Sequence, residues 1–119
     1  MRRLIPLAAI LALLAAPSAF TASSATKLTG TTGPGFTITV KKAGKKVTKV
    51  AAGKYTLTVS DKSSQHNFVL NGPGIKNKMI TGLAFMGTKT VTVTLKKGRY
   101  EYYCTPHRSI GMRGFIRVT

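Results

Sequence analysis

Short runs of alternating apolar and polar residues make up much of the chain from residue 26 onward. In residues 36–40, 55–59 and 91–95, apolar side chains occupy every second position. An alternation of period two predicts a β-strand with one buried face, and no stretch of the chain keeps the 3.6-residue spacing of an amphipathic helix. The pattern therefore predicts an all-β protein.

Clusters of glycine, proline and lysine separate these runs. Residues 41–46, KKAGKK, lie between two apolar runs and predict a tight hairpin at which Gly44 supplies the permissive backbone. Residues 71–74 (NGPG) and 96–98 (KKG) predict two further turns. The segment 75–87 is the least regular, and its pattern predicts a loop or a single helical turn.

Further strands are predicted over residues 66–70, 99–104 and 114–118. Together the runs give about seven short strands at intervals of roughly ten residues, which is typical of a Greek-key β-sandwich or barrel. The sequence has no internal repeat and no linker long enough to divide it. One domain over residues 26–119 is therefore expected.

The N-terminal 25 residues have a different character. Arg2 and Arg3 precede an apolar run over residues 4–16, and small polar residues follow up to Ala25. This order is typical of a secretory signal peptide, and we expect residues 1–25 to be one, with cleavage after Ala25. Cleavage near residues 16–18 and a retained N-terminal anchor remain alternatives. The predicted destination is the periplasm, the cell envelope or the extracellular space.

Basic residues far outnumber acidic ones, with 19 Lys plus Arg against two Asp plus Glu. Without Arg2 and Arg3, 17 basic residues face two acidic ones, so the net charge of the mature chain is +15. Such a charge favours an anionic partner, and an acidic redox protein or an anionic envelope surface fits an exported chain. Nucleic acid binding is not expected, since the aromatic residues lie in strands rather than among the lysines.

One cysteine and two histidines are the residues that point to chemistry. Cys104 ends a predicted strand, and His107 and Met112 follow it within one loop. His66, at the start of another predicted strand, is the only other histidine. A thiolate, two imidazoles and a weak thioether are the ligands of a trigonal His₂Cys copper site with a distant methionine. We therefore predict that His66, Cys104, His107 and Met112 bind one copper ion that cycles between Cu⁺ and Cu²⁺.

Each of these residues also has a purely structural interpretation. A single cysteine at a strand end is commonly an inert core residue, and a methionine commonly fills a gap in the core. An unpaired thiol in an oxidising compartment is a liability, however, unless something occupies it. Met79 and Met86 are rivals for the axial position, although both lie in the irregular segment. A zinc site is a weaker alternative, because zinc rarely takes a thioether.

The segment 103–107, YCTPH, together with Gly111 and Met112, resembles the C-terminal copper loop of plastocyanin-like cupredoxins, and His66 with Asn67 and Phe68 resembles their upstream copper histidine. The resemblance spans residues 36–119. It implies equatorial ligands at His66, Cys104 and His107 and an axial ligand at Met112. It also implies that Asn67 ties the segment of His66 to the loop of Cys104 by a hydrogen bond.

Electron transfer between envelope redox partners is the function that this resemblance implies. We further expect electrons to leave through His107, with Arg108 and Arg113 meeting acidic residues of the partner. A copper carrier or scavenger of the envelope is the alternative. An enzyme is not expected. A copper oxidase or nitrite reductase would need further histidines for a second centre, and a binuclear copper centre would need two cysteines, whereas the chain has two histidines and one cysteine. We expect a monomer.

Overall fold

The computed structural model describes residues 25–119. The predicted signal peptide, residues 1–25, lies outside the described residues apart from Ala25. No helix within residues 25–119 is long and apolar enough to cross a membrane.

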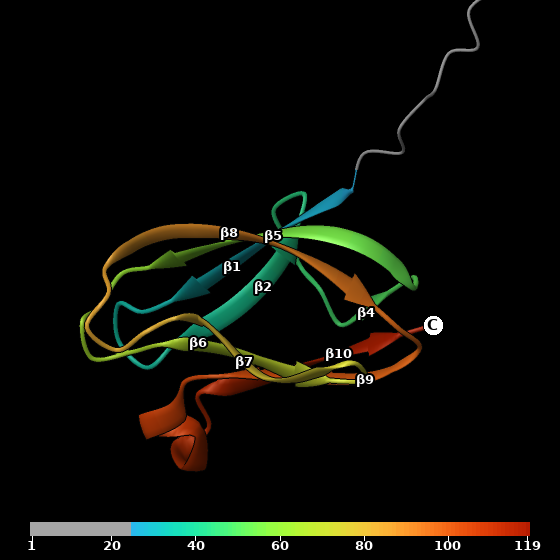
Figure 1. The fold of residues 1–119 in the computed structure, drawn as a ribbon. Coiled ribbons are helices and arrows are strands. Elements are labelled where there is room, and N and C mark those ends of the chain that lie inside the picture. The colour runs from blue at the N-terminus through green and yellow to red at the C-terminus, as the bar shows by residue number, and fades with distance from the viewer. Residues whose placement is uncertain (1–24) are drawn as a thin grey trace, which may run out of the picture.

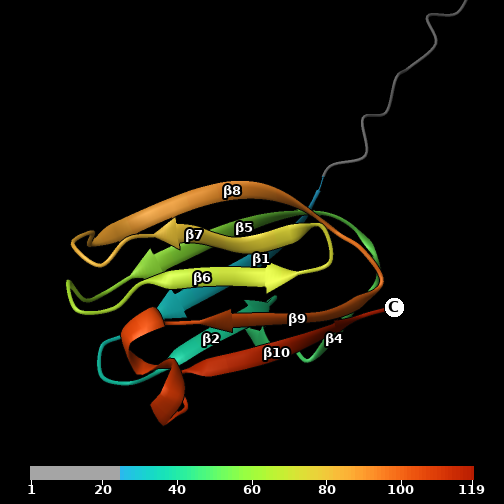
Figure 2. The ribbon, with the colours of Figure 1, turned by 60° about the horizontal axis from the view of Figure 1, so that its bottom comes forward.

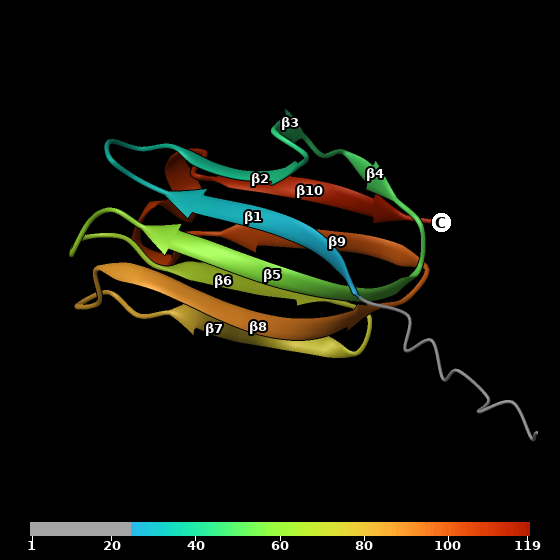
Figure 3. The same cartoon turned by 90° about the horizontal axis from the view of Figure 1, so that it is seen from above.

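Two five-stranded β-sheets pack face to face (Figure 1). In order across the first sheet lie β3 (Lys45–Lys46), β2 (Ile38–Lys42), β1 (Thr26–Thr32), β5 (Gly53–Asp61) and β8 (Gly87–Leu95). The second contains β4 (Lys49–Val50), β10 (Arg113–Val118), β9 (Gly98–Tyr103), β6 (Phe68–Gly72) and β7 (Ile75–Thr81). Figure 3 shows the first sheet lying across the second. The predicted all-β sandwich is confirmed, and it is a sandwich rather than a closed barrel.

The hydrophobic core fills the space between the sheets. Leu57 and Val59 of β5 and Tyr100 and Tyr102 of β9 are between 0% and 3% exposed. These are the alternate residues of their strands, as the period-two pattern predicts. Removal of this apolar surface from water is the main force that holds the two sheets together.

The hairpin between β2 and β3 matches its prediction. Ala43 and Gly44 form the turn, with φ angles of 50° and 78°. Two consecutive positive φ angles are typical of a type I′ turn, whose twist matches that of the flanking strands. Gly44 adopts this backbone without strain, whereas Ala43 carries a Cβ atom into it.

The strand prediction fell short at β1 and β7. Segment 75–87 was expected to be a loop or helical turn, and that prediction is wrong for residues 75–81, which form strand β7, but holds for the loop of residues 82–86. Most of this edge strand is exposed, and bulges interrupt its pairing with β6, so no apolar alternation marks it. Strand β1 was missed because it is rich in threonine and glycine. Gly30 of β1 packs closely against the ring of Phe68, since a Cβ atom at this position would lie only 3.0 Å from that ring.

The structure also corrects the predicted position of Phe36. The alternation of residues 36–40 placed Phe36 on the buried face of a strand, but β2 begins only at Ile38, and Phe36 is 65% exposed. The loop of residues 33–37 precedes β2 and lies at the end of the sandwich where the loop of residues 62–67 and the 3-10 helix η1 (Thr105–Ile110) also lie (Figure 2). The C-terminus lies at the opposite end.

Candidate metal centre

The side chains of His66, Cys104 and His107 meet at this loop end. The two Nδ1 atoms of His66 and His107 lie 3.0 Å apart, and the Sγ atom of Cys104 lies 3.6 Å from the first and 3.5 Å from the second. Within residues 25–119 this is the one group of three or more His, Cys, Asp or Glu residues close enough to share a metal ion.

The dimensions of this triangle suit a metal ion. A triangle with sides of 3.0, 3.5 and 3.6 Å has a circumradius of about 2.0 Å, so one point lies at that distance from all three atoms. Bonds from a metal to imidazole nitrogen and thiolate sulfur are about 2.0–2.3 Å long. The three donors therefore fit one ion that lies in or near their plane, and soft thiolate with imidazole is a donor set that suits copper.

Backbone hydrogen bonds shape the loop that follows Cys104. The amide of Cys104 donates to the carbonyl of Met112 over 3.1 Å, and the amide of Met112 donates to the carbonyl of His107 over 3.1 Å. Helix η1 ends at Gly111, whose φ of 99° lies in the left-handed region that glycine favours. The loop thus returns upon itself, and residues 104 and 112 lie side by side.

Asn67 connects the two segments that supply the ligands. Its Oδ1 atom accepts a 2.7 Å hydrogen bond from the amide of Thr105, and its Nδ2 atom donates to Thr105 Oγ1 over 3.0 Å. Asn67 is fully buried, so at its end these bonds are shielded from bulk water, whereas Thr105 is exposed. The tie between His66 and the Cys104 loop that the family resemblance implied is present.

Met112 is the buried methionine at this end of the molecule. It is 1% exposed and belongs to the same apolar cluster as Cys104, which is fully buried. Met79 and Met86 are 58% and 61% exposed, so both lie at the surface. The assignment of an axial bond to Met112 stays a prediction.

The two histidines differ in their exposure. His66 is 4% exposed, whereas His107 is half-buried. The exposed ring of Phe36 lies edge-on against both imidazoles, with centroids 4.8 Å from His107 and 5.8 Å from His66. Ile110 is also strongly exposed, at 67%. Sequence reasoning missed Phe36, although the turn residues Gly-Pro-Gly at positions 33–35 signalled that a loop continues up to it.

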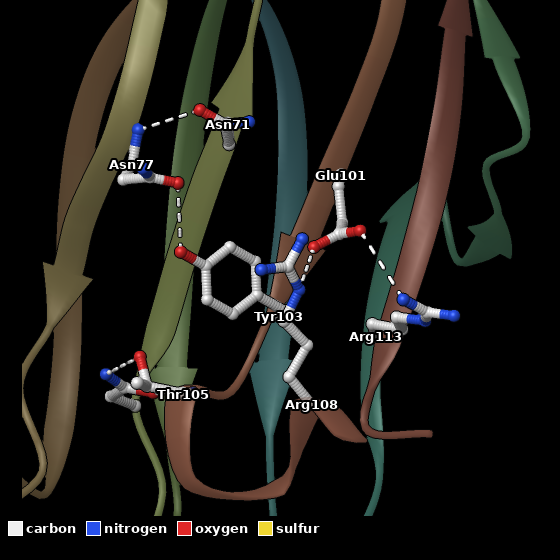
Figure 4. Close-up of polar contacts among 8 residues, drawn as sticks. Asn71, Asn77, Glu101, Tyr103, Thr105, Arg108 and Arg113 are labelled. Carbon is white, nitrogen blue, oxygen red and sulfur yellow. Dashed lines mark hydrogen bonds and ion pairs between the residues drawn. The ribbon is translucent and has the colours of Figure 1, made fainter. Parts of the chain in front are cut away.

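Glu101 holds two arginines beside the metal loop. Its carboxylate lies 2.5 Å from Nε of Arg108 and 3.9 Å from a terminal nitrogen of Arg113 (Figure 4). The guanidinium of Arg108 also lies over the ring of Tyr103, at 4.5 Å. Both arginine side chains are about half exposed, so they keep a surface for a partner, but Glu101 offsets part of their charge. No local pattern in the sequence indicates this pairing of Glu101 with the two arginines.

A β-sandwich that brings one thiolate and two imidazoles together between the loops at one end defines a mononuclear copper protein of the cupredoxin class. The model of the family described as copper binding proteins, plastocyanin/azurin family, matches residues 37–119. The chain therefore belongs to this family and binds copper.

Curated relatives agree with this assignment. The chain is 33% identical over 77 residues to a chloroplastic plastocyanin of Physcomitrium patens, a match that covers 59% of this chain and 46% of the relative. It is 35% identical over 81 residues to a plastocyanin of Prochlorothrix hollandica, covering 61% of this chain and 60% of the relative. The matched part thus spans about half of one relative's length and three-fifths of the other's.

Solved structures share the fold. The rusticyanin of Thiobacillus ferrooxidans superposes with a TM-score of 0.57 at 22% sequence identity, over 78% of this chain and 76% of the other. A reduced rusticyanin superposes with a TM-score of 0.58 at 24% identity, over 78% of each chain. At such identities the likeness establishes the common β-sandwich alone.

Proposed function

We propose that this protein carries single electrons between redox partners of the cell envelope. In this proposal His66, Cys104 and His107 would hold one copper ion, and Met112 would supply a weak fourth ligand. The observation that carries the proposal is the triangle of donor atoms, whose sides are 3.0, 3.5 and 3.6 Å. Copper, when bound, supplies a one-electron couple between Cu²⁺ and Cu⁺.

The protein contributes a fixed set of donors. Cys104 lies at the end of β9, His66 is tied through its neighbour Asn67 to Thr105, and hydrogen bonds close the loop up to Met112. A ligand set that is held by two sheet-anchored segments moves little when the charge on the ion changes. Small movement lowers the barrier to electron transfer, because fewer bonds need to rearrange.

Burial of Cys104, His66 and Met112 keeps water away from the donors, since none is more than 4% exposed. His107 is the ligand with part of its ring at the surface, and its Nδ1 atom points inward to the donor triangle. We propose that electrons leave through this ring, within an apolar surface formed by Phe36 and Ile110.

The visible absorption spectrum of the Cu²⁺ protein tests the site. We expect an intense thiolate-to-copper band, and we expect Cys104→Ser to abolish it while Met79→Leu, at an exposed methionine, leaves it unchanged. A colourless Cu²⁺ protein would overturn the proposed site. Rapid exchange of Cu⁺ to a soluble chelator, combined with slow electron transfer to an oxidant, would favour the alternative of a copper carrier.

An acidic partner is the finer part of the proposal. Arg108 and Arg113 lie beside the proposed exit, and the charge of the mature chain is strongly positive, so the encounter should weaken as salt rises. Replacing both arginines with glutamate should remove most of this salt dependence. Lys45→Glu with Lys46→Glu, the same change of charge on the β2–β3 hairpin, is the control. Equal effects of the two double variants would contradict docking at the arginines.

Export through a signal peptide of residues 1–25 stays part of the proposal. N-terminal sequencing of the protein recovered from the envelope or the medium should begin at Thr26. A first residue near position 17 would instead support the earlier cleavage site, and an uncleaved chain would support a retained anchor. A monomer is expected from size-exclusion chromatography.

A further inference from the structure

A second cluster of charge lies on the outer face of the β4–β10–β9 sheet, away from the metal loop. Arg117 of β10 pairs in register with Lys49 of β4 on one side and with Arg99 of β9 on the other. All three residues are exposed and occupy outward-facing positions in their strands. Three cations therefore form one row across three neighbouring strands.

Such a row is costly for the isolated protein. Like charges directly opposite each other on neighbouring strands are destabilising. The chain has two acidic residues, and neither relieves the row, because Glu101 is paired with Arg108 and Arg113 and Asp61 is only 2% exposed. No ion pair within residues 25–119 involves Lys49, Arg99 or Arg117.

Two residues of the row, Arg99 and Arg117, also line a groove. A depression of about 600 Å³ opens at this place, and its walls come from the β8–β9 turn, β9, β10 and the residue before β4. Its lining residues are Thr48, Lys97, Gly98, Arg99, Phe115, Arg117 and Val118. Lys97, Arg99 and Arg117 are thus the three cations of the groove, and Lys49, which follows Thr48, is a fourth cation beside it. The guanidinium of Arg99 lies 3.8 Å from the centroid of Phe115, so its side chain is already ordered by a cation–π contact.

We propose that this groove binds a compact multivalent phosphate anion, such as a short chain of phosphate groups. Guanidinium groups recognise phosphate oxygens through paired hydrogen bonds, and an anion placed across the row would replace repulsion between the cations by attraction to each of them. The proposal does not rest on the electron-transfer function, because the groove shares no residue with the copper site.

The dimensions favour such an anion over an acidic peptide. Neighbouring strands lie about 4.8 Å apart, so the row is roughly 10 Å long. Acidic side chains on one face of an extended peptide recur only every ~6.8 Å, which would bring about two carboxylates to the four cations. A membrane surface is less suited, since the exposed large apolar residues, which are Phe36, Met79, Leu83, Met86 and Ile110, all lie outside the groove and leave it without an anchor for insertion.

The groove and the metal site lie far apart. Arg99 precedes Cys104 by five residues of an extended strand, a separation of about 16 Å at ~3.3 Å per residue. Figure 2 shows β9 and β10 running between the loop end of the sandwich and the end where the chain terminates. Phosphate binding is therefore expected to leave the visible spectrum of the copper unchanged.

Isothermal titration of the Cu⁺-loaded protein with tripolyphosphate, at constant ionic strength, tests the proposal. The reduced form is used because hard phosphate oxygens compete poorly for soft Cu⁺. We expect one saturable site, and we expect Arg99→Gln with Arg117→Gln to weaken binding at least tenfold. Lys45→Gln with Lys46→Gln, which removes the same charge from an exposed hairpin outside the groove, should weaken it by less than threefold.

Thermal unfolding is a second measurement, and it distinguishes a loss of binding from a loss of the fold. Tripolyphosphate should raise the melting temperature of the wild-type protein and of the hairpin variant, but not that of the groove variant. Equal loss of affinity in both double variants would show a non-specific charge effect and overturn the proposal. So would the absence of saturable binding, tighter binding of hexaglutamate, or binding to phosphatidylglycerol vesicles without binding to tripolyphosphate.

Discussion

At the scale of single residues, the metal centre depends on side chains that never touch the metal. Asn67 is fully buried and makes both of its side-chain hydrogen bonds to Thr105, which follows Cys104. Phe36 lies against both histidine rings, although it is itself exposed. These residues help to position the donor side chains, so their substitution should change the geometry of the site even though all of the donors are still present.

Replacement of Asn67 with alanine should lower the free energy of unfolding of the copper-free protein by about 1–3 kcal/mol. The variant loses two hydrogen bonds and leaves a cavity in a buried position. Urea denaturation measures the change. Thr105→Val, which removes the bond to Oγ1 but keeps the amide bond, is the control and should cost less. An equal cost in both variants would mean that the amide bond contributes nothing.

Tyr102 should make the protein sensitive to alkaline pH. Burial raises the pKa of its phenol above the ordinary value of 10.0. Because the folded pKa is the higher one, the folded protein keeps its proton above pH 10 while the unfolded chain loses it, so stability falls as pH rises beyond about 10. Below that pH this contribution is complete.

Tyr102→Phe tests this, since phenylalanine preserves the ring that stacks on Phe68 with an interplanar angle of 6°. The free energy of unfolding of the variant should decline less steeply between pH 9 and 11.5 than that of the wild type. Titration of the lysines is common to both proteins and cancels in the comparison. Parallel curves would contradict a raised pKa at this tyrosine.

At the scale of elements, the strands differ in how clearly the sequence marks them. From Tyr55 onward strand β5 alternates buried and partly buried residues, so its strand pattern can be recognised in the sequence. Strand β7 is an edge strand with mostly exposed residues, so its apolar pattern carries no signal of period two. The β2–β3 hairpin is marked by its turn residues rather than by its strands, which are only five and two residues long.

Replacement of Ala43 with asparagine should stabilise this hairpin. Ala43 has a φ of 50°, and a left-handed backbone costs an ordinary residue roughly 1–2 kcal/mol, whereas asparagine followed by glycine is a preferred pair for this turn. We expect a gain of about 0.5–1 kcal/mol in the free energy of unfolding. Ala52→Asn, at an exposed alanine without a positive φ, serves as the control and should show no gain.

At the scale of the whole molecule, the metal donors and the phosphate groove lie at different places on the sandwich. The metal donors lie between loops at one end, and the phosphate groove lies toward the other end of β9 and β10. Both acidic residues of the chain are engaged or buried, so the positive charge faces outward with little internal compensation. The row of Lys49, Arg117 and Arg99 lies away from the donor triangle, whereas beside the metal loop Glu101 offsets part of the charge of the nearby arginines.

Removal of copper should lower the melting temperature substantially. An ion at a thousand times its dissociation constant stabilises the folded state by about 4 kcal/mol. For a domain of this size each kcal/mol shifts the midpoint by roughly 4–8 °C, so we expect a loss of more than 10 °C, measured by calorimetry of the loaded and copper-free forms. In Cys104→Ser the two forms should differ much less. A loaded protein that melts with the copper-free one would contradict tight binding.

The sequence alone determined the class of fold and the candidate ligands. Alternating runs predict strands because a strand turns its side chains to opposite faces, and Cys104, His107 and Met112 lie close enough along the chain for one loop to present them. The spacing of these residues can be read from the sequence without knowledge of the fold.

Only the tertiary structure decided what depends on contacts between distant segments. In the fold, Nδ1 of His66, which lies 38 residues upstream, is 3.6 Å from the sulfur of Cys104. Phe36 lies at the surface beside the imidazoles and not in the core, where its sequence pattern placed it. The fold also aligns Lys49, Arg117 and Arg99 in one row, although they are scattered along the sequence. Strand pairing and loop packing set these distances, and neither leaves a local pattern in the chain.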